Sequence, residues 1–185
     1  MTPSYASDDA LMIVDVQNDF CPGGALGVED GDAVVPVLNR AIEAARQAGV
    51  PVVASRDWHP ERHSSFKPQG GPWPPHCVQE TEGAAFHPDL ALPEDVHRVS
   101  KGTFEAEDQY SALDGTGLGD WLWHQGVQRL WVGGLALDVC VRATVLDALK
   151  EGFAVKLMHE ATRPVDPDGG RQALEAMRDA GADIV

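Results

Sequence analysis

The chain has 185 residues, of which 43% are hydrophobic and 23% are charged, as in an ordinary soluble globular protein. Its formal net charge is −15, so nucleic-acid backbones and anionic membrane surfaces should repel it, and neither is an expected partner. No apolar run approaches the ~18–20 residues that are needed to cross a bilayer.

This length predicts a single domain over residues 1–185. The first nine residues are polar and lack the basic and apolar regions of a signal peptide, which predicts a cytoplasmic protein. Cysteine occurs at Cys21, Cys77 and Cys140. An odd and sparse set of cysteines does not indicate a disulfide framework, so each is interpreted singly.

Apolar segments of strand length alternate with amphipathic segments of helix length along the chain. An expected helix over residues 32–48 has Asp32 as its cap and Gly49 as its stop. The alternation predicts an α/β fold of three layers, α/β/α, with a mostly parallel six-stranded sheet. The expected strands are 10–14, 50–55, 96–100, 129–133, 153–158 and 182–185, and the remaining helices are 118–125, 140–150 and 168–180.

Polar or turn-forming residues follow four of the expected strands. Asp15, Asp57 and Lys101 each stand at or just beyond a strand end, and the turn over residues 133–139 follows another. Ligands of parallel α/β sheets bind outside the carboxyl ends of the strands. The sequence therefore predicts a functional site that these four segments share.

Three residues at these ends have the chemistry of a nucleophile with its acid and base. Cys140 opens an expected helix, where backbone N–H groups and the helix dipole favour a thiolate and could hold an oxyanion. Lys101 should keep Asp15 and Cys140 ionised, and Asp15 should carry the proton. Each residue also has a structural interpretation: Cys140 as a core residue, Lys101 as a lysine reaching solvent, and Asp15 as a loop cap.

Residues 57–93 form a long segment rich in Pro, Gly and His, which is typical of a functional loop. In extended chain Asp57 and His59 point the same way, and His76 could close a site from the far end. Such oxygen and imidazole donors suit one divalent ion, Zn²⁺ first, with Fe²⁺ and Mn²⁺ as alternatives. His63 is a candidate further ligand or a support for the ligands. The alternative interpretation is that these histidines cap turns.

Taken together, five segments resemble the nicotinamidases, also called pyrazinamidases, of the isochorismatase-like hydrolase superfamily. They cover nearly the whole chain and are specific jointly rather than singly. In order they are DVQNDFCPGG at 15–24, RDWHP at 56–60 with HSSF at 63–66, WPPHCV at 73–78 with GA at 83–84, KG at 101–102 with YS at 110–111, and GGLA at 133–136 with DVCV at 138–141.

The resemblance implies a Rossmann-like hydrolase fold and the hydrolysis of nicotinamide, and of pyrazinamide, in NAD salvage. Residues 57–93 would be an insert that binds metal and substrate. A non-proline cis peptide is implied at Leu135–Ala136. The implied roles are a catalytic triad of Asp15, Lys101 and Cys140; metal ligands Asp57, His59 and His76, with His63 as a further candidate; a pocket of Phe20, Trp73, Tyr110 and Leu135; and an oxyanion hole from the N–H groups of Ala136 and Cys140.

The chain departs from many relatives at Leu137 and Val139, where a small polar residue and an aromatic residue are common. A more apolar pocket rim is therefore expected, which leaves substrate breadth open. The rival functions are a related amidase or ureido-hydrolase without the metal loop, an isochorismate hydrolase without the nucleophilic cysteine, and a non-catalytic metal- or ligand-binding module. The native metal, and whether the protein is a monomer or a homo-oligomer, stay open.

Overall fold

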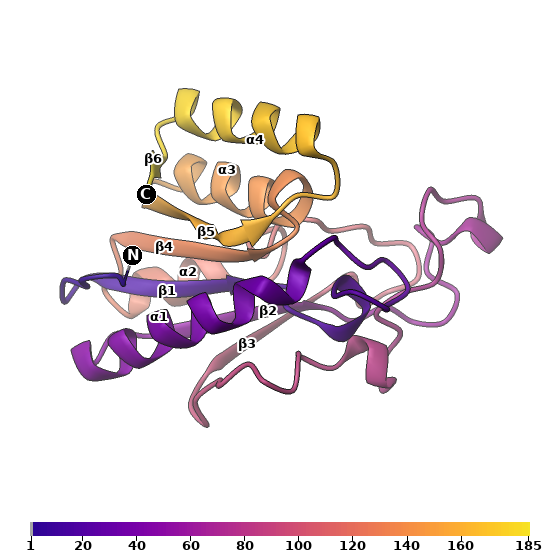
Figure 1. Ribbon diagram of the computed structural model, residues 1–185, viewed down its shortest axis with the longest axis horizontal. Helices are drawn as coiled ribbons and strands as arrows, with labels where there is room; N and C mark the ends of the chain where they lie inside the picture. Colours follow the sequence, from indigo (N-terminus) through magenta and orange to yellow (C-terminus); the bar gives the residue numbers. More distant parts are fainter. Residues whose placement is uncertain (1) are drawn as a thin grey trace.

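The computed structural model describes residues 2–185 and contains one sheet of six strands in the order β3-β2-β1-β4-β5-β6. All neighbouring strands are parallel, which confirms the expected fold class. The chain builds one half of the sheet outward from β1 and then returns to build the other half from β4 (Figure 1). The strands are β1 (Asp9–Val14), β2 (Val52–Asp57), β3 (His97–Lys101), β4 (Arg129–Leu135), β5 (Ala154–Arg163) and β6 (Asp183–Ile184).

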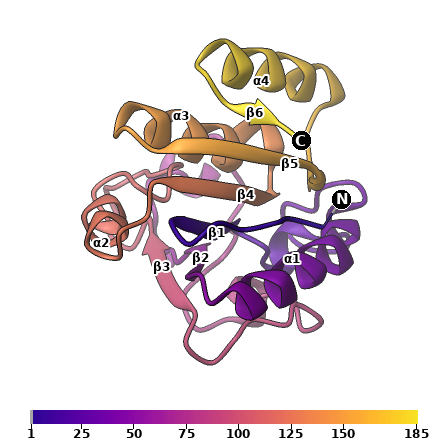
Figure 2. The ribbon, with the colours of Figure 1, turned by 90° about the vertical axis from the view of Figure 1, so that its left-hand side faces the viewer.

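Helices cover both faces of the sheet because side chains alternate along each buried strand. In β1, Met12 packs in one hydrophobic cluster and Ile13 in the other. The helix α1 (Val34–Ala48) covers the Ile13 face, and the long segment between β2 and β3 adds further apolar side chains there. The opposite face is covered by α2 (Leu118–His124), α3 (Arg142–Lys150) and α4 (Pro167–Asp179) (Figures 1 and 2).

Some element boundaries differ from the sequence expectation. Asp32 does not cap α1, because it lies inside a short 3₁₀ turn, η2 (Gly31–Ala33), and Ala33 takes the cap position. Gly49 ends α1 in the left-handed conformation, as predicted. The helix expected over residues 140–150 begins two residues later, as α3, and Cys140 itself lies in the π-helical turn before it, η5 (Leu137–Val141). Within residues 2–185, no helix is both long enough and apolar enough to span a bilayer.

Candidate active site and metal centre

The candidate residues gather at the carboxyl ends of four adjacent strands. Asp15 follows β1, Asp57 ends β2, Lys101 ends β3, and Cys140 lies in η5 just after β4. These strands are neighbours in the sheet, and β1 and β4 flank the point where the chain changes its direction of winding. Parallel α/β sheets bind ligands at such a point. The fold thus brings together residues that lie up to 125 positions apart in the sequence (140 − 15).

Lys101 is fully buried and lies at the centre of this group. Its Nζ is 2.7 Å from Asp15 Oδ2 and 2.5 Å from Asp57 Oδ1, and it donates a hydrogen bond of 3.4 Å to Cys140 Sγ. Burial alone would lower the pKa of Lys101, but the two carboxylates outweigh it and hold the pKa well above its usual value. Lys101 is therefore a permanent buried cation, and the interpretation of a lysine reaching solvent is wrong.

Asp15 is also fully buried, and its backbone is in the left-handed region with φ 48°. Aspartate tolerates this conformation better than most residues that have a side chain. Its Oδ1 accepts a 2.7 Å hydrogen bond from the hydroxyl of Ser55 on β2. Burial raises the pKa of Asp15 despite the opposing charge of Lys101, so this carboxyl group has a stronger tendency to hold a proton than an exposed one.

The thiol of Cys140 corrects one expectation. The sequence predicted that Lys101 and the helix terminus would lower its pKa. Burial instead raises the pKa of Cys140 well above the usual value; Lys101 opposes this shift, and the negative charges of Asp15 and Asp57 add to it. The resting thiol is therefore protonated. Its Sγ and the carboxylate oxygens of Asp15 and Asp57 lie within 4.8 Å of one another, so a proton acceptor stands close by.

The other two cysteines are buried and free as well. Burial raises the pKa of Cys21 to about 11 and also raises that of Cys77. A shifted pKa therefore does not distinguish Cys140 from the other thiols. What distinguishes it is the hydrogen bond from Lys101 and its position on the wall of a cavity.

The candidate metal-ligand atoms face one another on three side chains, those of Asp57, His59 and His76. The Nε2 atoms of His59 and His76 lie 3.4 and 3.7 Å from Asp57 Oδ2, and all three side chains are buried. Each Nδ1 lies 2.8 Å from a backbone carbonyl, that of Gly102 for His59 and that of Pro74 for His76. A proton on each Nδ1 leaves both Nε2 atoms free as acceptors, which is the arrangement found around metal-binding histidines.

The two oxygens of Asp57 have separate partners, since Oδ1 contacts Lys101 and Oδ2 faces the imidazoles. Burial would raise the pKa of Asp57, but the charge of Lys101 is the largest opposing influence, and the pKa lies well below the usual value. Asp57 therefore stays ionised. This buried set of one carboxylate and two imidazoles fits a divalent transition metal.

Backbone contacts hold this metal-binding group in place. The Gln17 side chain accepts a hydrogen bond from the Asp57 N–H at 2.9 Å and donates to the Asp57 carbonyl at 2.8 Å. Gly102 has φ +60°, and a Cβ on it would overlap the His59 ring. Sequence reasoning missed the roles of Gln17 and Ser55. The available signal was position: Gln17 is two residues beyond Asp15, and Ser55 is two residues before Asp57.

His63 lies beside the metal-binding group but is directed elsewhere. Its ring stacks on that of His59, with centroids 4.0 Å apart. Its Nδ1 is 2.7 Å from the Ser65 hydroxyl, and its Nε2 is 2.5 Å from the Glu107 carbonyl oxygen. Both ring nitrogens therefore have protein partners, which favours support of His59 over direct metal binding.

A cavity of about 270 Å³ opens onto both chemical groups, because Cys140, Asp57 and His76 all lie on its wall. Phe20, Trp73 and Tyr110 line it as expected, and the Trp73 indole N–H donates a hydrogen bond of 3.2 Å to the Tyr110 hydroxyl. Ala136 is also on the wall, and the peptide bond between Leu135 and Ala136 is cis, as the resemblance implied. The other lining residues are Ala25, Leu26, Gly27, Val28, Val139 and Val165.

Two expected pocket residues lie elsewhere. The Leu135 side chain is fully buried in the core on the α1 face, and Leu137 is buried in the core on the other face; neither lines the cavity. Of the two substituted positions only Val139 lines the cavity, and Val165 is a further apolar lining residue that the sequence did not predict. The reason is local geometry: the chain leaves β4 and enters η5 here, so successive side chains turn away from the cavity.

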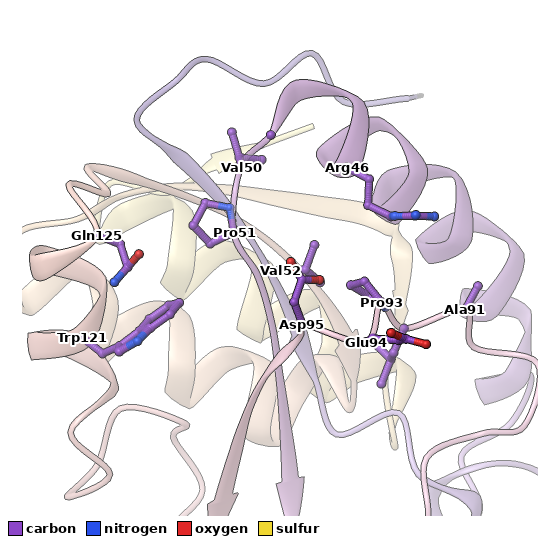
Figure 3. A pocket seen from close by; sticks show the side chains of 12 residues that line it. Arg46, Val50, Pro51, Val52, Ala91, Pro93, Glu94, Asp95, Trp121 and Gln125 are labelled. Atoms are coloured by element: carbon purple, nitrogen blue, oxygen red, sulfur yellow. The ribbon is translucent and has the colours of Figure 1, made fainter.

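A larger hollow of about 850 Å³ lies at the opposite end of the sheet (Figure 3). It lies beside Val52, which begins β2, and Asp95, which precedes β3, and Trp121 of α2 also lines it. None of its described lining residues is a cysteine or a histidine. Despite its size, this hollow therefore lacks the nucleophile and the metal donors of the smaller cavity.

Known proteins resemble this chain over nearly its whole length. The model of the isochorismatase domain matches residues 9–185. A nicotinamidase of Escherichia coli (strain K12) is 41% identical over 198 residues, covering 95% of this chain and 93% of its own. A pyrazinamidase of Pyrococcus horikoshii, solved in complex with zinc, has a TM-score of 0.94 and 47% identity over 96% of this chain and 98% of its own. An L. infantum protein solved with nicotinate has a TM-score of 0.92 and 38% identity over 100% and 96%.

The family match covers the whole sheet and every residue of the two chemical groups. The order of the strands, the cavity at the change of winding and the cysteine that follows β4 are all parts of this matched region. The chain therefore belongs to the isochorismatase family.

Proposed function

We propose that this protein is a nicotinamidase, which hydrolyses nicotinamide to nicotinate and ammonia. One observation carries the proposal: the Cys140 thiol, paired with Lys101, faces the same cavity as the Asp57 and His76 donors. A substrate of this site must present an electrophilic carbon to sulfur and a Lewis base to a metal. Nicotinamide does both through its carboxamide and its ring nitrogen. The relatives named as nicotinamidase and pyrazinamidase, and the neighbour that binds nicotinate, support this substrate class.

Asp57, His59 and His76 would hold the metal, and we propose Zn²⁺ because a similar protein was solved in complex with zinc. When bound, the metal supplies a Lewis-acidic position for the ring nitrogen, which orients the substrate. Phe20 and Trp73 flank the ring from the cavity wall. This clamp would place the carboxamide beside Cys140.

In the first half-reaction, Asp15 accepts the Cys140 Sγ–H proton as sulfur attacks the carboxamide carbon. Lys101 keeps the charge near Sγ and Asp15 balanced as the proton moves. The N–H groups of Ala136 and Cys140 would receive the oxyanion. Asp15 then returns its proton to the leaving nitrogen, the C–N bond breaks, and ammonia departs from a thioester.

In the second half-reaction, a water molecule replaces ammonia, and Asp15 accepts one of its protons as the oxygen attacks the thioester. The C–S bond breaks, sulfur takes the proton back from Asp15, and the acid that forms loses its remaining proton to solvent and leaves as nicotinate. Asp15 serves twice as base and twice as acid. A raised pKa suits this role, because the group must both take and release a proton near neutral pH.

The direct test is ammonia release from nicotinamide by zinc-loaded protein, with Cys140→Ala as the control. Turnover that requires both Cys140 and nicotinamide supports the proposal. No ammonia from nicotinamide, together with turnover of a non-aromatic amide or ureido compound, would favour the related amidase or ureido-hydrolase. Metal binding without turnover of either substrate would favour the non-catalytic binding module. A cytoplasmic place in NAD salvage stays a prediction.

A further inference from the structure

Asp19 belongs to a motif of the sequence whose chemistry the proposed reaction does not use. It lies in the short turn η1 (Asn18–Phe20), directly before the cavity residue Phe20. Its Oδ2 accepts a 2.8 Å hydrogen bond from the N–H of Cys77, and its Oδ1 accepts one of 3.2 Å from the N–H of Ala25. Its backbone oxygen accepts a further bond of 2.9 Å from Leu26. Asp19 thus joins its own turn, η1, to Cys77 on one side and to Ala25 and Leu26 on the other.

The bond to Cys77 is the contact that matters for the metal, because Cys77 directly follows His76. Cys77 has φ 46°, a left-handed conformation that side chains other than Asn and Asp rarely adopt. A charge-assisted hydrogen bond to its N–H stabilises that conformation. The Cys77 N–H belongs to the peptide unit that begins at His76, so a bond to it restrains the backbone that carries the His76 side chain.

We propose that Asp19 is a positioning residue for the metal ligand His76, an inference that rests on the metal site proposed above. Asp57 is already held by Gln17, and His59 by its bond to Gly102. The His76 ring has the Pro74 carbonyl at its Nδ1, and Asp19 adds a bond to the backbone directly after His76. The same carboxylate holds the N–H of Ala25, and the Asp19 backbone oxygen holds that of Leu26, so Asp19 also joins the metal loop to the opposite cavity wall.

The close packing around the Asp19 carboxylate allows a second, independent way to displace it. Gly83 packs so closely against it that a Cβ at this position would overlap the carboxylate atoms, and these are the three nearest atoms to that Cβ. Gly83→Ala should therefore displace the Asp19 carboxylate without altering any metal ligand. In an Asp19→Ala background the same substitution meets a smaller side chain and should do little.

The neighbouring Asn18 is a matched control. Its side chain donates a 2.8 Å hydrogen bond to the Glu82 carbonyl, so it also ties this turn to the segment between β2 and β3, but six residues beyond His76. Within residues 2–185, no hydrogen bond joins the Asn18 side chain to His76 or Cys77. If loop ordering in general sets the metal affinity, Asn18→Ala should resemble Asp19→Ala; if the Asp19–Cys77 bond sets it, the two variants should differ.

The experiment measures the Zn²⁺ affinity of full-length, metal-stripped protein by competition with a chromogenic chelator, and the thermal midpoint of the stripped protein. Asp19→Ala should weaken Zn²⁺ binding about tenfold, the low end of what supporting contacts to metal ligands contribute. Asp19→Asn, which keeps one acceptor oxygen, should fall between Asp19→Ala and wild type. Gly83→Ala should weaken binding in the Asp19 protein but not in Asp19→Ala, a non-additivity that exposes coupling. Asn18→Ala should bind Zn²⁺ like wild type.

Wild-type affinity in Asp19→Ala, with or without a lower thermal midpoint, would overturn the inference, as would additive effects of Gly83→Ala and Asp19→Ala. If Asp19→Ala does not fold, Asp19→Asn and Gly83→Ala decide the matter on the same measurement. His59→Ala distinguishes a failure of the Asp19 inference from a failure of the proposed metal site. If it abolishes Zn²⁺ binding while Asp19→Ala does not weaken it, only the role of Asp19 fails; if it keeps wild-type affinity, the metal site fails and the inference with it.

Discussion

Replacing Lys101 with methionine removes the one cation that lies between two buried carboxylates. Asp15 and Asp57 both contact Lys101 Nζ, at 2.7 and 2.5 Å, and no exposed surface of Lys101 remains. Methionine fills a similar volume, so the cost is electrostatic rather than a cavity. Removing one partner of a buried ion pair typically costs about 3–5 kcal/mol, because the remaining charge stays buried without compensation.

For a chain of this size, 1 kcal/mol corresponds to a shift of about 2–4 °C in the thermal midpoint. The expected loss for Lys101→Met is therefore about 6–20 °C in metal-free protein at pH 7. Zn²⁺ should restore part of this loss, since a cation at Asp57 replaces some of the missing charge. Lys150→Met is the matched control: Lys150 is largely exposed and 3.7 Å from Asp147, and such a change usually costs less than about 0.5 kcal/mol.

The pH dependence has a definite sign. In wild type the lowered pKa of Asp57 stabilises the fold above the ordinary aspartate pKa of about 3.9, and this stability is lost only in stronger acid. In Lys101→Met the buried carboxylates have no cation, so their pKa values rise above the unfolded value. That variant should gain stability as the pH falls from about 7 to about 5, and its deficit should narrow.

Urea unfolding with chelator present, at about pH 7 and about pH 5, gives the free energy of unfolding for wild type, Lys101→Met and Lys150→Met. If Lys101→Met were as stable as Lys150→Met at neutral pH, the reasoning would be refuted. A deficit that widened in acid would show instead that methionine disturbs packing rather than charge.

Three further predictions concern chemistry. Cys140→Ser should abolish ammonia release while leaving the fold and zinc content intact, whereas Cys21→Ser should stay active. Mass spectrometry of a quenched reaction should find a nicotinoyl adduct on the Cys140 peptide, which would locate the nucleophile. Near-wild-type turnover by Cys140→Ser would exclude Cys140 as the nucleophile. His59→Ala should lose zinc and activity together, and His63→Ala should lose less of both, as measured by metal analysis; full zinc occupancy in His59→Ala would contradict the ligand assignment. Pyrazinamide should be hydrolysed, but benzamide, which lacks a ring nitrogen, should react far more slowly; equal kcat/KM for benzamide and nicotinamide would show that the metal does not hold the ring.

The sequence by itself determined the fold class and the candidates for the reactive residues. Apolar runs such as residues 10–14 are strand-forming wherever they lie, and a polar residue directly after such a run, like Asp15, must emerge at a strand end. The spacing of Asp57 and His59 likewise sets both side chains on one side of an extended chain. These are local properties, which the chain expresses before any long-range contact forms.

Only the tertiary structure decided which of these groups form ion pairs, which protonation states follow, and which residues form the cavity wall. That Lys101 reaches Asp57 as well as Asp15 depends on β2 lying between β1 and β3. The raised pKa of Cys140 depends on burial, which no local pattern contains. Leu135 and Leu137 leave the cavity, and Val165 enters it, because the chain turns at η5 and β5 runs on to Arg163. Desolvation and charge pairing arise between segments that are distant in sequence, so they exist only once the sheet has assembled.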